Sequence, residues 1–500
     1  MPFVTEGVAG VLIQETSEKM STAIIVVGLG YGDEGKGSLI DFLTQKHSAK
    51  LVVRFNGGAQ AGHNVVLDDG REHKFSQFGS GTFHGARTFL SRYMLFNPIT
   101  LLSEAKHLTE VGVKDPLSLL TVEKTAKVTT PFHMAANRVR ELLRGPHVHG
   151  SCGMGIGETM RHSIAHPEDT LLVQDMADHY AAVRKLERIR DYFIRELSPS
   201  VLKFQHAGGE FSEQLRTELE ILIHDPLIVG QVAAKFVEVY RKLNVVGREY
   251  LNAHLAVKDQ TVVFEGAQGV LLDQDYGFHP HTTWSDCTFG NALKLIESFN
   301  LDTMPYTNSN TWGARPTVSP CEVTKIGVLR GYMTRHGAGP FVTEDKGLTM
   351  PKSEHNAMGA WQQGFRLGHF DPIATRYALE VIGGVDQLAL TCLDHLPFAS
   401  SGFRTCKSYT SAGAEERARP ARMVGLDSDY KWDRIPVNPI EPNEKHLAYQ
   451  QATTDVLNFL KPVYDHLPDV DSFIAHVEQT LKTPVKIASF GPKASDKSER

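Results

Sequence analysis

Short apolar runs alternate along this chain with longer stretches in which apolar residues recur every three or four positions. The short runs cover residues 23–27, 51–55, 261–264, 388–391 and 485–489. The longer stretches cover residues 132–144, 179–196 and 229–243. Short apolar runs are typical of buried strands, and the longer periodicity is typical of helices that bury one face. The alternation predicts an α/β fold with a large, mainly parallel sheet flanked by helices.

A glycine-rich turn lies between the first apolar run and an amphipathic stretch at residues 38–43. The turn reads Gly30-Tyr31-Gly32-Asp33-Glu34-Gly35-Lys36-Gly37. A strand, a glycine turn and a helix in this order present backbone N–H groups and the positive end of a helix dipole to an anion. Because ligands of such sheets bind beyond the carboxyl ends of the strands, the sequence predicts a phosphate ligand there.

The residues of this turn match neither of two common phosphate motifs in full. G-x-G-x-x-G is satisfied but does not require the acidic pair, and Gly37 stands where G-x-x-x-x-G-K-[ST] needs a hydroxyl for magnesium. A carboxylate inside a phosphate turn repels the ligand unless a cation or a proton transfer uses it. We therefore interpret Asp33 as a Mg²⁺ ligand or a general base. Glu34 is interpreted as an acid that complements the helix dipole.

Composition narrows the class of protein. The chain has 500 residues and a formal net charge of -6, which gives no overall field for nucleic acid or an anionic membrane. The five cysteines form no C-x-x-C pair, so we expect neither a disulfide framework nor a zinc site. No apolar stretch approaches the roughly 18 to 20 residues of a membrane span. We expect a cytoplasmic protein that binds no nucleic acid and no membrane, with residues 1–21 as a flexible N-terminal extension.

Three further turns are rich in small residues. Residues 57–62 lead to His63, and their size leaves space for a ligand beside the imidazole, so His63 is a candidate acid. Residues 150–157 and 264–269 are typical of turns that bind a phosphate, a sugar or a base. Each turn alone is also compatible with a tight connection that binds nothing. Four such turns exceed what one dinucleotide needs.

Together these segments resemble the adenylosuccinate synthetase family from about residue 23 to residue 492. The family motifs G-D-E-G-K-G, A-G-H and F-E-G-A-Q-G recur at residues 32–37, 61–63 and 264–269. The motifs T-R-V-G-A-G-P-F, T-K-L-D and S-T-G-P have near matches at residues 334–341, 391–394 and 489–492. The resemblance implies one elaborated P-loop-NTPase-like domain over residues 22–500, and a homodimer.

The resemblance also implies a reaction. It is the GTP-dependent joining of aspartate to the 6-position of inosine monophosphate (IMP), or of a related purine monophosphate, through a 6-phosphoryl intermediate. Asp33 is then the base for the N1 proton and binds Mg²⁺ beside the Gly62 carbonyl. His63 donates to the phosphate oxygens, and Lys36 neutralises the transferred group.

Further residues are implied to contact the nucleotides. Asp394 would read the guanine N–H donors, and Gln268 and Thr283 would hold the monophosphate. The implied contacts to nucleotide and phosphate groups are Gly32, Glu34, Gly35, Gly37, Gln60, Cys152, Gln268, Thr283, Asp394, Ser489 and Gly491.

Several positions depart from the family pattern around the substrate. Gln60 replaces an asparagine, and Asn64 replaces a threonine after the histidine. Cys152 and Met154 replace a threonine and an arginine in the second glycine cluster. The family arginine that reaches the neighbouring subunit has Arg161 as its nearest substitute. We therefore expect a reshaped substrate pocket.

The loop that holds the aspartate carboxylates departs further. Its run of arginines appears within residues 359–371 with Arg366 as the survivor, and Gln or Phe cannot replace the bidentate pairing of arginine with a carboxylate. We assign Arg366 to the amino-acid substrate. Cys392 replaces a lysine of the guanine pocket, which weakens the expected preference for GTP.

Two alternatives stay open. One is a branch that acts on another purine, such as GMP or dGMP, like the phage enzymes that make 2-aminoadenine precursors; those lack the aspartate of the glycine loop, which this chain keeps as Asp33. The other is a nucleotide-binding homologue without turnover. The depleted arginine loop supports it, whereas Asp33, Lys36 and His63 oppose it, because binding alone does not require them.

Overall fold

The fold is described by a computed structural model. It describes residues 20–145, 150–224, 227–303, 321–348, 364–398, 403–411, 432–438 and 443–500. Residues 1–19, most of the predicted extension, lie outside this part of the chain, and Ser21 already begins the first strand.

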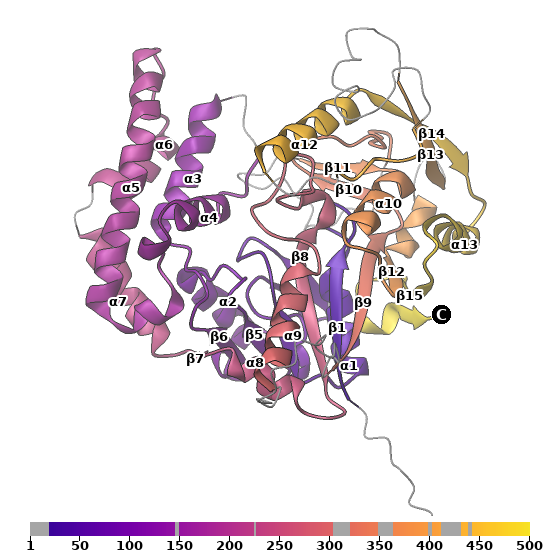
Figure 1. Ribbon diagram of the computed structural model, residues 1–500, viewed down its shortest axis with the longest axis horizontal. Helices are drawn as coiled ribbons and strands as arrows, with labels where there is room; N and C mark the ends of the chain where they lie inside the picture. The colour runs from indigo at the N-terminus through magenta and orange to yellow at the C-terminus, as the bar shows by residue number, and fades with distance from the viewer. Residues whose placement is uncertain are drawn as a thin grey trace, which may run out of the picture.

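A ten-stranded sheet forms the centre of the molecule (Figure 1). Its strands in spatial order are β16 (Lys497–Glu499), β15 (Val485–Ser489), β12 (Gln387–Thr391), β9 (Cys321–Arg330), β1 (Ser21–Gly28), β8 (Thr261–Gly269), β2 (Leu51–Arg54), β5 (Arg87–Leu90), β6 (Leu120–Glu123) and β7 (Asn244–Val246). All neighbours pair in parallel except β15 and β16. The predicted mainly parallel sheet is confirmed, and each of the five apolar runs is one of its strands.

Helices flank the sheet, as the periodicity predicts. They are α1 (Lys36–Lys46), α2 (Pro98–Glu110), α3 (Pro131–Arg144), α4 (Ile156–Ala165), α5 (His179–His206), α6 (Glu213–Leu219), α7 (Ile228–Tyr240), α8 (Glu249–Leu255), α9 (Gly290–Thr303), α10 (Pro372–Val381), α12 (Glu444–Leu457) and α13 (Val470–Leu481). Helices α3 to α7 gather beyond the β7 end of the sheet (Figure 1). No helix in the described ranges is long and apolar enough to cross a membrane.

In the described residues, three two-stranded antiparallel sheets lie outside the ten-stranded sheet. They pair β3 (His63–Val66) with β4 (Glu72–Phe75), β10 (Met333–His336) with β11 (Phe365–Gly368), and β13 (Arg404–Ser411) with β14 (Leu460–His466). The first two carry residues that bear on the site below.

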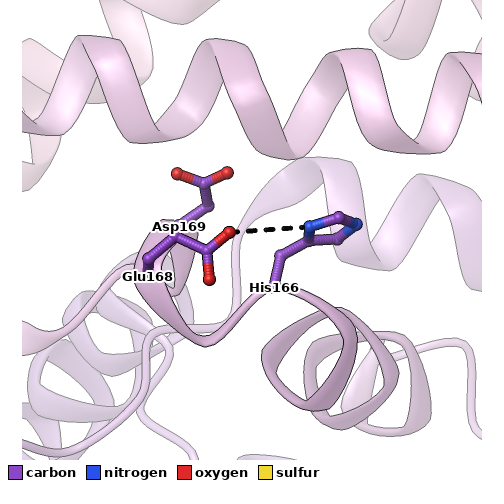
Figure 2. Close-up of side chains that lie close together, drawn as sticks. All are labelled: His166, Glu168 and Asp169. Atoms are coloured by element: carbon purple, nitrogen blue, oxygen red, sulfur yellow. Dashed lines mark ion pairs between the residues drawn. The ribbon is translucent and has the colours of Figure 1, made fainter.

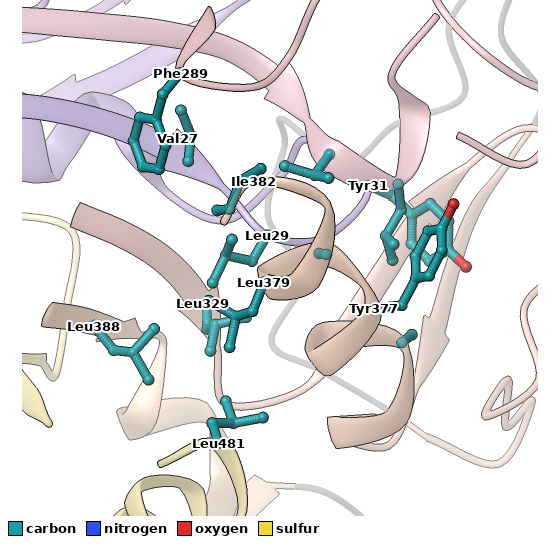
Figure 3. Packing of buried hydrophobic residues seen from close by; sticks show 14 of the residues in the cluster. Val27, Leu29, Tyr31, Phe289, Leu329, Tyr377, Leu379, Ile382, Leu388 and Leu481 are labelled. Carbon is teal, nitrogen blue, oxygen red and sulfur yellow. The ribbon is translucent and has the colours of Figure 1, made fainter. Parts of the chain in front are cut away.

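The central strands are buried on both faces, because helices cover the sheet on either side. Strand β1 is buried at every position except Thr22. On one face, Leu379 of α10 and Ile382, just after it, pack beside two leucines of the sheet region (Figure 3). These are Leu29, which directly follows β1, and Leu329 of β9. This packing holds the carboxyl ends of β1, β9 and β12 at one edge of the sheet.

Candidate active site

A cavity of about 920 Å³ opens at the carboxyl ends of β1, β8, β9, β12 and β15. That volume suits nucleotide-sized ligands. The residues of the sequence assignment that line it are Gly32, Asp33, Gly35, Lys36, Gly37, Gln60, Gly62, His63, Cys152, Gln268, Thr283, Asp394, Ser489 and Gly491. Turns far apart in the sequence therefore meet in one place. Glu34 and Arg366 are not among the lining residues.

Glu34 closes the glycine loop from inside. Its carboxylate accepts the Gly32 N–H at 2.7 Å and pairs with the Lys36 ammonium at 2.8 Å. Lys36 also donates to the Gly32 carbonyl at 3.0 Å, and both charged side chains are buried. A Cβ at Gly28 would lie 2.0 Å from Glu34 Oε2, so a larger residue there would displace the Glu34 side chain. Glu34 does not line the cavity, and its described partners are Gly32 and Lys36, so its side chain shapes the loop.

Asp33 lies in the same loop with its side chain 38% exposed to the cavity. Its Oδ2 accepts a hydrogen bond from Arg330 Nη1 at 3.1 Å. Arg330 is the last residue of β9 and lies 297 positions from Asp33 in the sequence, and nothing in the local sequence marked it as a site residue. The pairing exists because β1 and β9 are neighbours in the sheet.

His63 is buried and its Nδ1 lies 2.5 Å from Glu265 Oε1. Burial lowers the pKa of His63 to about 4, so the ring is neutral at pH 7 in the free protein. Burial alone would raise the pKa of Glu265, but the Arg54 guanidinium and the hydrogen bonds from His63 and Ser80 lower it to about 2. An ionised carboxylate only accepts, so Nδ1 carries the proton and Nε2 is the nitrogen left for a ligand.

Lys74 reaches the cavity from β4, directly opposite Asn64 of β3. A Cβ at Gly62 would lie 2.0 Å from Lys74 Cε, so the lysine stem crosses the bare glycine. Sequence reasoning missed Lys74. The available signal was the turn around Gly70, which folds residues 63–66 and 72–75 into a hairpin and places Lys74 beside His63.

Arg366 has other partners than a substrate. It pairs with Glu344 at 2.6 Å and donates to the carbonyls of Gly337 and Gly339 at 3.1 and 2.9 Å. The antiparallel pairing of β10 with β11 directs it into this hairpin, where Arg335 is its cross-strand partner. Residues 359–363 of the same loop lie outside the described residues. The assignment of Arg366 to the amino-acid substrate is therefore not supported by its place in the structure.

Arg335 and Arg161 also line the cavity. The Arg335 guanidinium stacks over Tyr31 at 4.3 Å and donates to the carbonyls of Ala338 and Pro340 at 3.0 and 2.9 Å. Arg161, the substitute for the family's intersubunit arginine, lies 3.6 Å from Glu158. Arg335 is a second residue that the sequence assignment missed.

The residues assigned to the guanine base also meet at the cavity. Asp394 lies 3.5 Å from His395, whose Nδ1 shares a hydrogen bond of 2.9 Å with the Tyr332 hydroxyl. Cys392 has a left-handed backbone (φ 55), which turns the chain after β12. Ser489 donates to the Gly491 carbonyl at 2.9 Å and so shapes the neighbouring turn.

A separate cluster of titratable groups lies on the helical side. His166, Glu168 and Asp169 bring ligand atoms within 4.8 Å of one another, and His166 pairs with Glu168 at 3.8 Å (Figure 2). Asp169 is bound to Arg188 at 2.5 Å. This pairing already satisfies one carboxylate, and we assign no metal to the cluster.

A sequence profile described as adenylosuccinate synthetase matches residues 25–498 of the chain. The chain belongs to the adenylosuccinate synthetase family. The match spans the glycine loop, the His63 turn and the Asp394 segment, and the family is one of ligases that act on purine nucleotides.

Relatives and solved structures agree with this membership. The adenylosuccinate synthetase of Marinomonas sp. (strain MWYL1) is 28% identical over 489 residues, covering 95% of this chain and 98% of the relative. That of Neisseria gonorrhoeae (strain ATCC 700825 / FA 1090) is 27% identical over 479 residues, covering 95% and 97%.

Two solved structures share the fold. The fully ligated adenylosuccinate synthetase of Plasmodium falciparum superposes with a TM-score of 0.67 at 19% identity, covering 95% of this chain and 99% of the other. The succinoaminodeoxyadenylate synthetase (PurZ) of cyanophage S-2L, bound to dGMP and dATP, gives 0.53 at 17% identity and covers 96% of each chain.

Proposed function

We propose that this chain is a GTP-dependent ligase that joins aspartate to the 6-position of IMP. The observation that carries the proposal is that Asp33, His63 and Asp394, from three separate segments, line one cavity in a member of this family. A general base, a phosphate-facing histidine and a reader of guanine N–H donors are the groups such a reaction needs.

In the first step, Asp33 takes the N1 proton of the 6-oxopurine. The 6-oxygen then attacks the γ-phosphorus of GTP, the bond to the β,γ-bridging oxygen breaks, and GDP leaves. In the second step, the amine of aspartate attacks C6 and inorganic phosphate leaves. Positioning and charge stabilisation account for most of the catalysis in phosphoryl transfer.

His63 stabilises the charge on the transferring phosphoryl group through Nε2. The ring must gain a proton for this, and an approaching polyphosphate favours the charged form. The Glu265 carboxylate at 2.5 Å holds Nδ1–H and stabilises the imidazolium when it forms. The Lys36 ammonium pairs with Glu34, and Lys36 also lines the cavity. We therefore assign it two roles: its positive charge contributes to the electrostatic field of the glycine loop, and it contacts the phosphates at the cavity wall.

A Mg²⁺ ion fits the donor set that the cavity offers. Asp33 presents a partly exposed carboxylate, and the exposed backbone of Gly62 lines the same cavity, so a carboxylate and a carbonyl oxygen are both available. Mg²⁺ in nucleotide sites takes one or two carboxylates together with phosphate oxygens. When bound, the ion would neutralise charge on the phosphates.

The amino-acid substrate needs a cation other than Arg366. Of the lysine and arginine side chains that line the cavity, Lys74 and Arg335 have no ion pair with a described residue. Arg335 donates to backbone carbonyls, which leaves the Lys74 ammonium. We assign Lys74 to an anionic group of the substrates.

A second candidate is the related reaction on a guanine nucleotide. It is favoured by the changed substrate turn, where Gln60 and Cys152 line the cavity. The retained Asp33 favours IMP. Mixing IMP, GMP or dGMP with aspartate, Mg²⁺ and GTP or ATP, and following products by mass, separates the candidates.

The same assay tests the assignment of the base. Asp33→Asn should lower kcat by about 10² to 10⁴. Asp471→Asn, which removes an exposed aspartate that lies 3.5 Å from Arg500, is the matched control and should match the parent. If the assay yields no nucleotide product from any purine, the ligase proposal is refuted and a binding protein is favoured.

We further propose that the protein is cytoplasmic and forms a homodimer. Light scattering of the purified protein tests the homodimer.

A further inference from the structure

Arg330 reaches the proposed base from outside the glycine loop. Its side chain is 13% exposed, and Nη1 lies 3.1 Å from Asp33 Oδ2. Strand β9 pairs with β1 up to Gly28 and Val328, so Arg330 stands two residues beyond that register, at the edge where the loop begins. The tertiary fold places this guanidinium against Asp33.

The glycine loop does not hold the Asp33 side chain with its own groups. The neighbouring Glu34 is fixed by the Gly32 N–H and by Lys36, and Thr391 donates to the Glu34 carbonyl at 2.7 Å. These contacts define the backbone of the loop. Among the described residues, the Asp33 carboxylate accepts its side-chain hydrogen bond from Arg330.

Arg330 is itself held in place. Its guanidinium stacks over the Tyr332 ring, with 5.1 Å between Arg330 Cζ and the ring centroid. The Tyr332 hydroxyl is tied to His395 at 2.9 Å. A planar guanidinium that stacks on a ring and bonds on its edge has little freedom, so it can impose one orientation on its partner.

We propose that Arg330 is a positioning residue that fixes the orientation of the Asp33 carboxylate for proton removal from the purine. This inference rests on the proposed function. A base displaced by about 1 Å costs roughly 10²-fold in rate, although substrate affinity need not change. The role therefore predicts a loss in kcat and not in KM for the purine.

Arg330→Met, Arg330→Lys and a control separate this role from a structural one. The control is Arg434→Met, because Arg434 also forms an arginine–carboxylate pair, with Glu380 at 2.9 Å, on the surface. We expect kcat of Arg330→Met to fall at least tenfold while KM for the purine stays within twofold of the parent. Arg330→Lys keeps the charge and should recover part of kcat, and Arg434→Met should match the parent.

Several results would overturn the proposal. They are a folded Arg330→Met variant with kcat within twofold of the parent, a loss confined to KM, or an Arg330→Lys variant no better than Arg330→Met. If Arg330→Met does not fold, Tyr332→Leu removes the stacking ring and should lower kcat with an unchanged purine KM; parental kcat would then count against the proposal.

A crystal structure gives a readout that does not depend on turnover. The Asp33 carboxylate should move or become disordered in the Arg330→Met protein relative to the parent. If the parent joins no amine to any purine, the proposed function fails, and this structural comparison still decides whether Arg330 positions Asp33. An unmoved, ordered Asp33 would refute it.

Discussion

Glu265→Gln tests whether the buried carboxylate behind His63 supports catalysis. Glu265 Oε1 lies 2.5 Å from His63 Nδ1, and Oε2 accepts the Ser80 N–H at 2.9 Å. A glutamine cannot satisfy both donors, because its NH₂ group must face one of them. Facing Ser80, it leaves a buried N–H unpaired; facing His63, it moves the ring proton to Nε2.

The magnitude follows from the interaction lost. A hydrogen bond to a charged group is worth about 1.5 to 3 kcal/mol, and each 1.36 kcal/mol is roughly tenfold in rate. We expect kcat to fall by about 10- to 150-fold with little change in KM for GTP or the purine, because the imidazolium forms only during phosphoryl transfer. Steady-state assays with varied purine and varied GTP measure this split.

Glu104→Gln is the matched control. Glu104 is also buried, accepts the backbone N–H groups of Ser76, Gln77 and Phe78, and lies 3.8 Å from His73, yet it does not line the cavity. Both variants should lose stability by about 1 to 3 kcal/mol in urea unfolding, since each leaves buried groups poorly paired. Parental kcat in a folded Glu265→Gln protein, or an equal loss of kcat in Glu104→Gln, would refute the reasoning.

Three further predictions concern specificity and stability. Asp394→Asn should narrow the preference for GTP over ATP in kcat/KM, because a carboxylate accepts two guanine N–H donors that adenine lacks; a parent that uses ATP equally well contradicts this role. The pKa of buried His63 is about 4, whereas its unfolded value is 6.5, so between these pH values the unfolded chain binds a proton that the folded chain does not. The stability of the fold is therefore unaffected by this group above pH 6.5 and falls as the pH drops towards 4. Urea unfolding at pH 5 should show roughly 2 kcal/mol less stability from this group, and His63→Gln should remove that part of the pH dependence. Arg366→Leu should lower Tm by loosening the β10–β11 hairpin while leaving KM for the amine unchanged; a raised amine KM at parental Tm would restore the substrate role.

The local pattern of the chain determined its fold class. Short apolar runs such as residues 23–27 favour buried strands, and the helical stretches between the runs favour a parallel sheet that helices cover on both faces. The glycine loop and the turn before His63 were also predictable from the sequence, because small residues at the end of a strand indicate that a ligand or another backbone segment comes close. These signals depend on neighbours in sequence.

The partners of the site residues were decided by the tertiary structure. Glu34 was interpreted from its place at a helix start, whereas its carboxylate closes the loop on Gly32 and Lys36. Arg366 looked free for a substrate until the β10–β11 hairpin set it against Glu344. Arg330 had no signal at all, since its contact with Asp33 spans 297 positions.

The physical reason is the same in each case. The spacing of apolar residues reflects the environment of a whole helix or strand. Because it depends on many residues, it can be detected in a single sequence. The partner of a single charged side chain depends on strand order and register, which are set by packing between elements far apart in the chain. The sequence therefore predicted a phosphate site at the edge of the sheet. Which cation faces which carboxylate was determined by the tertiary structure.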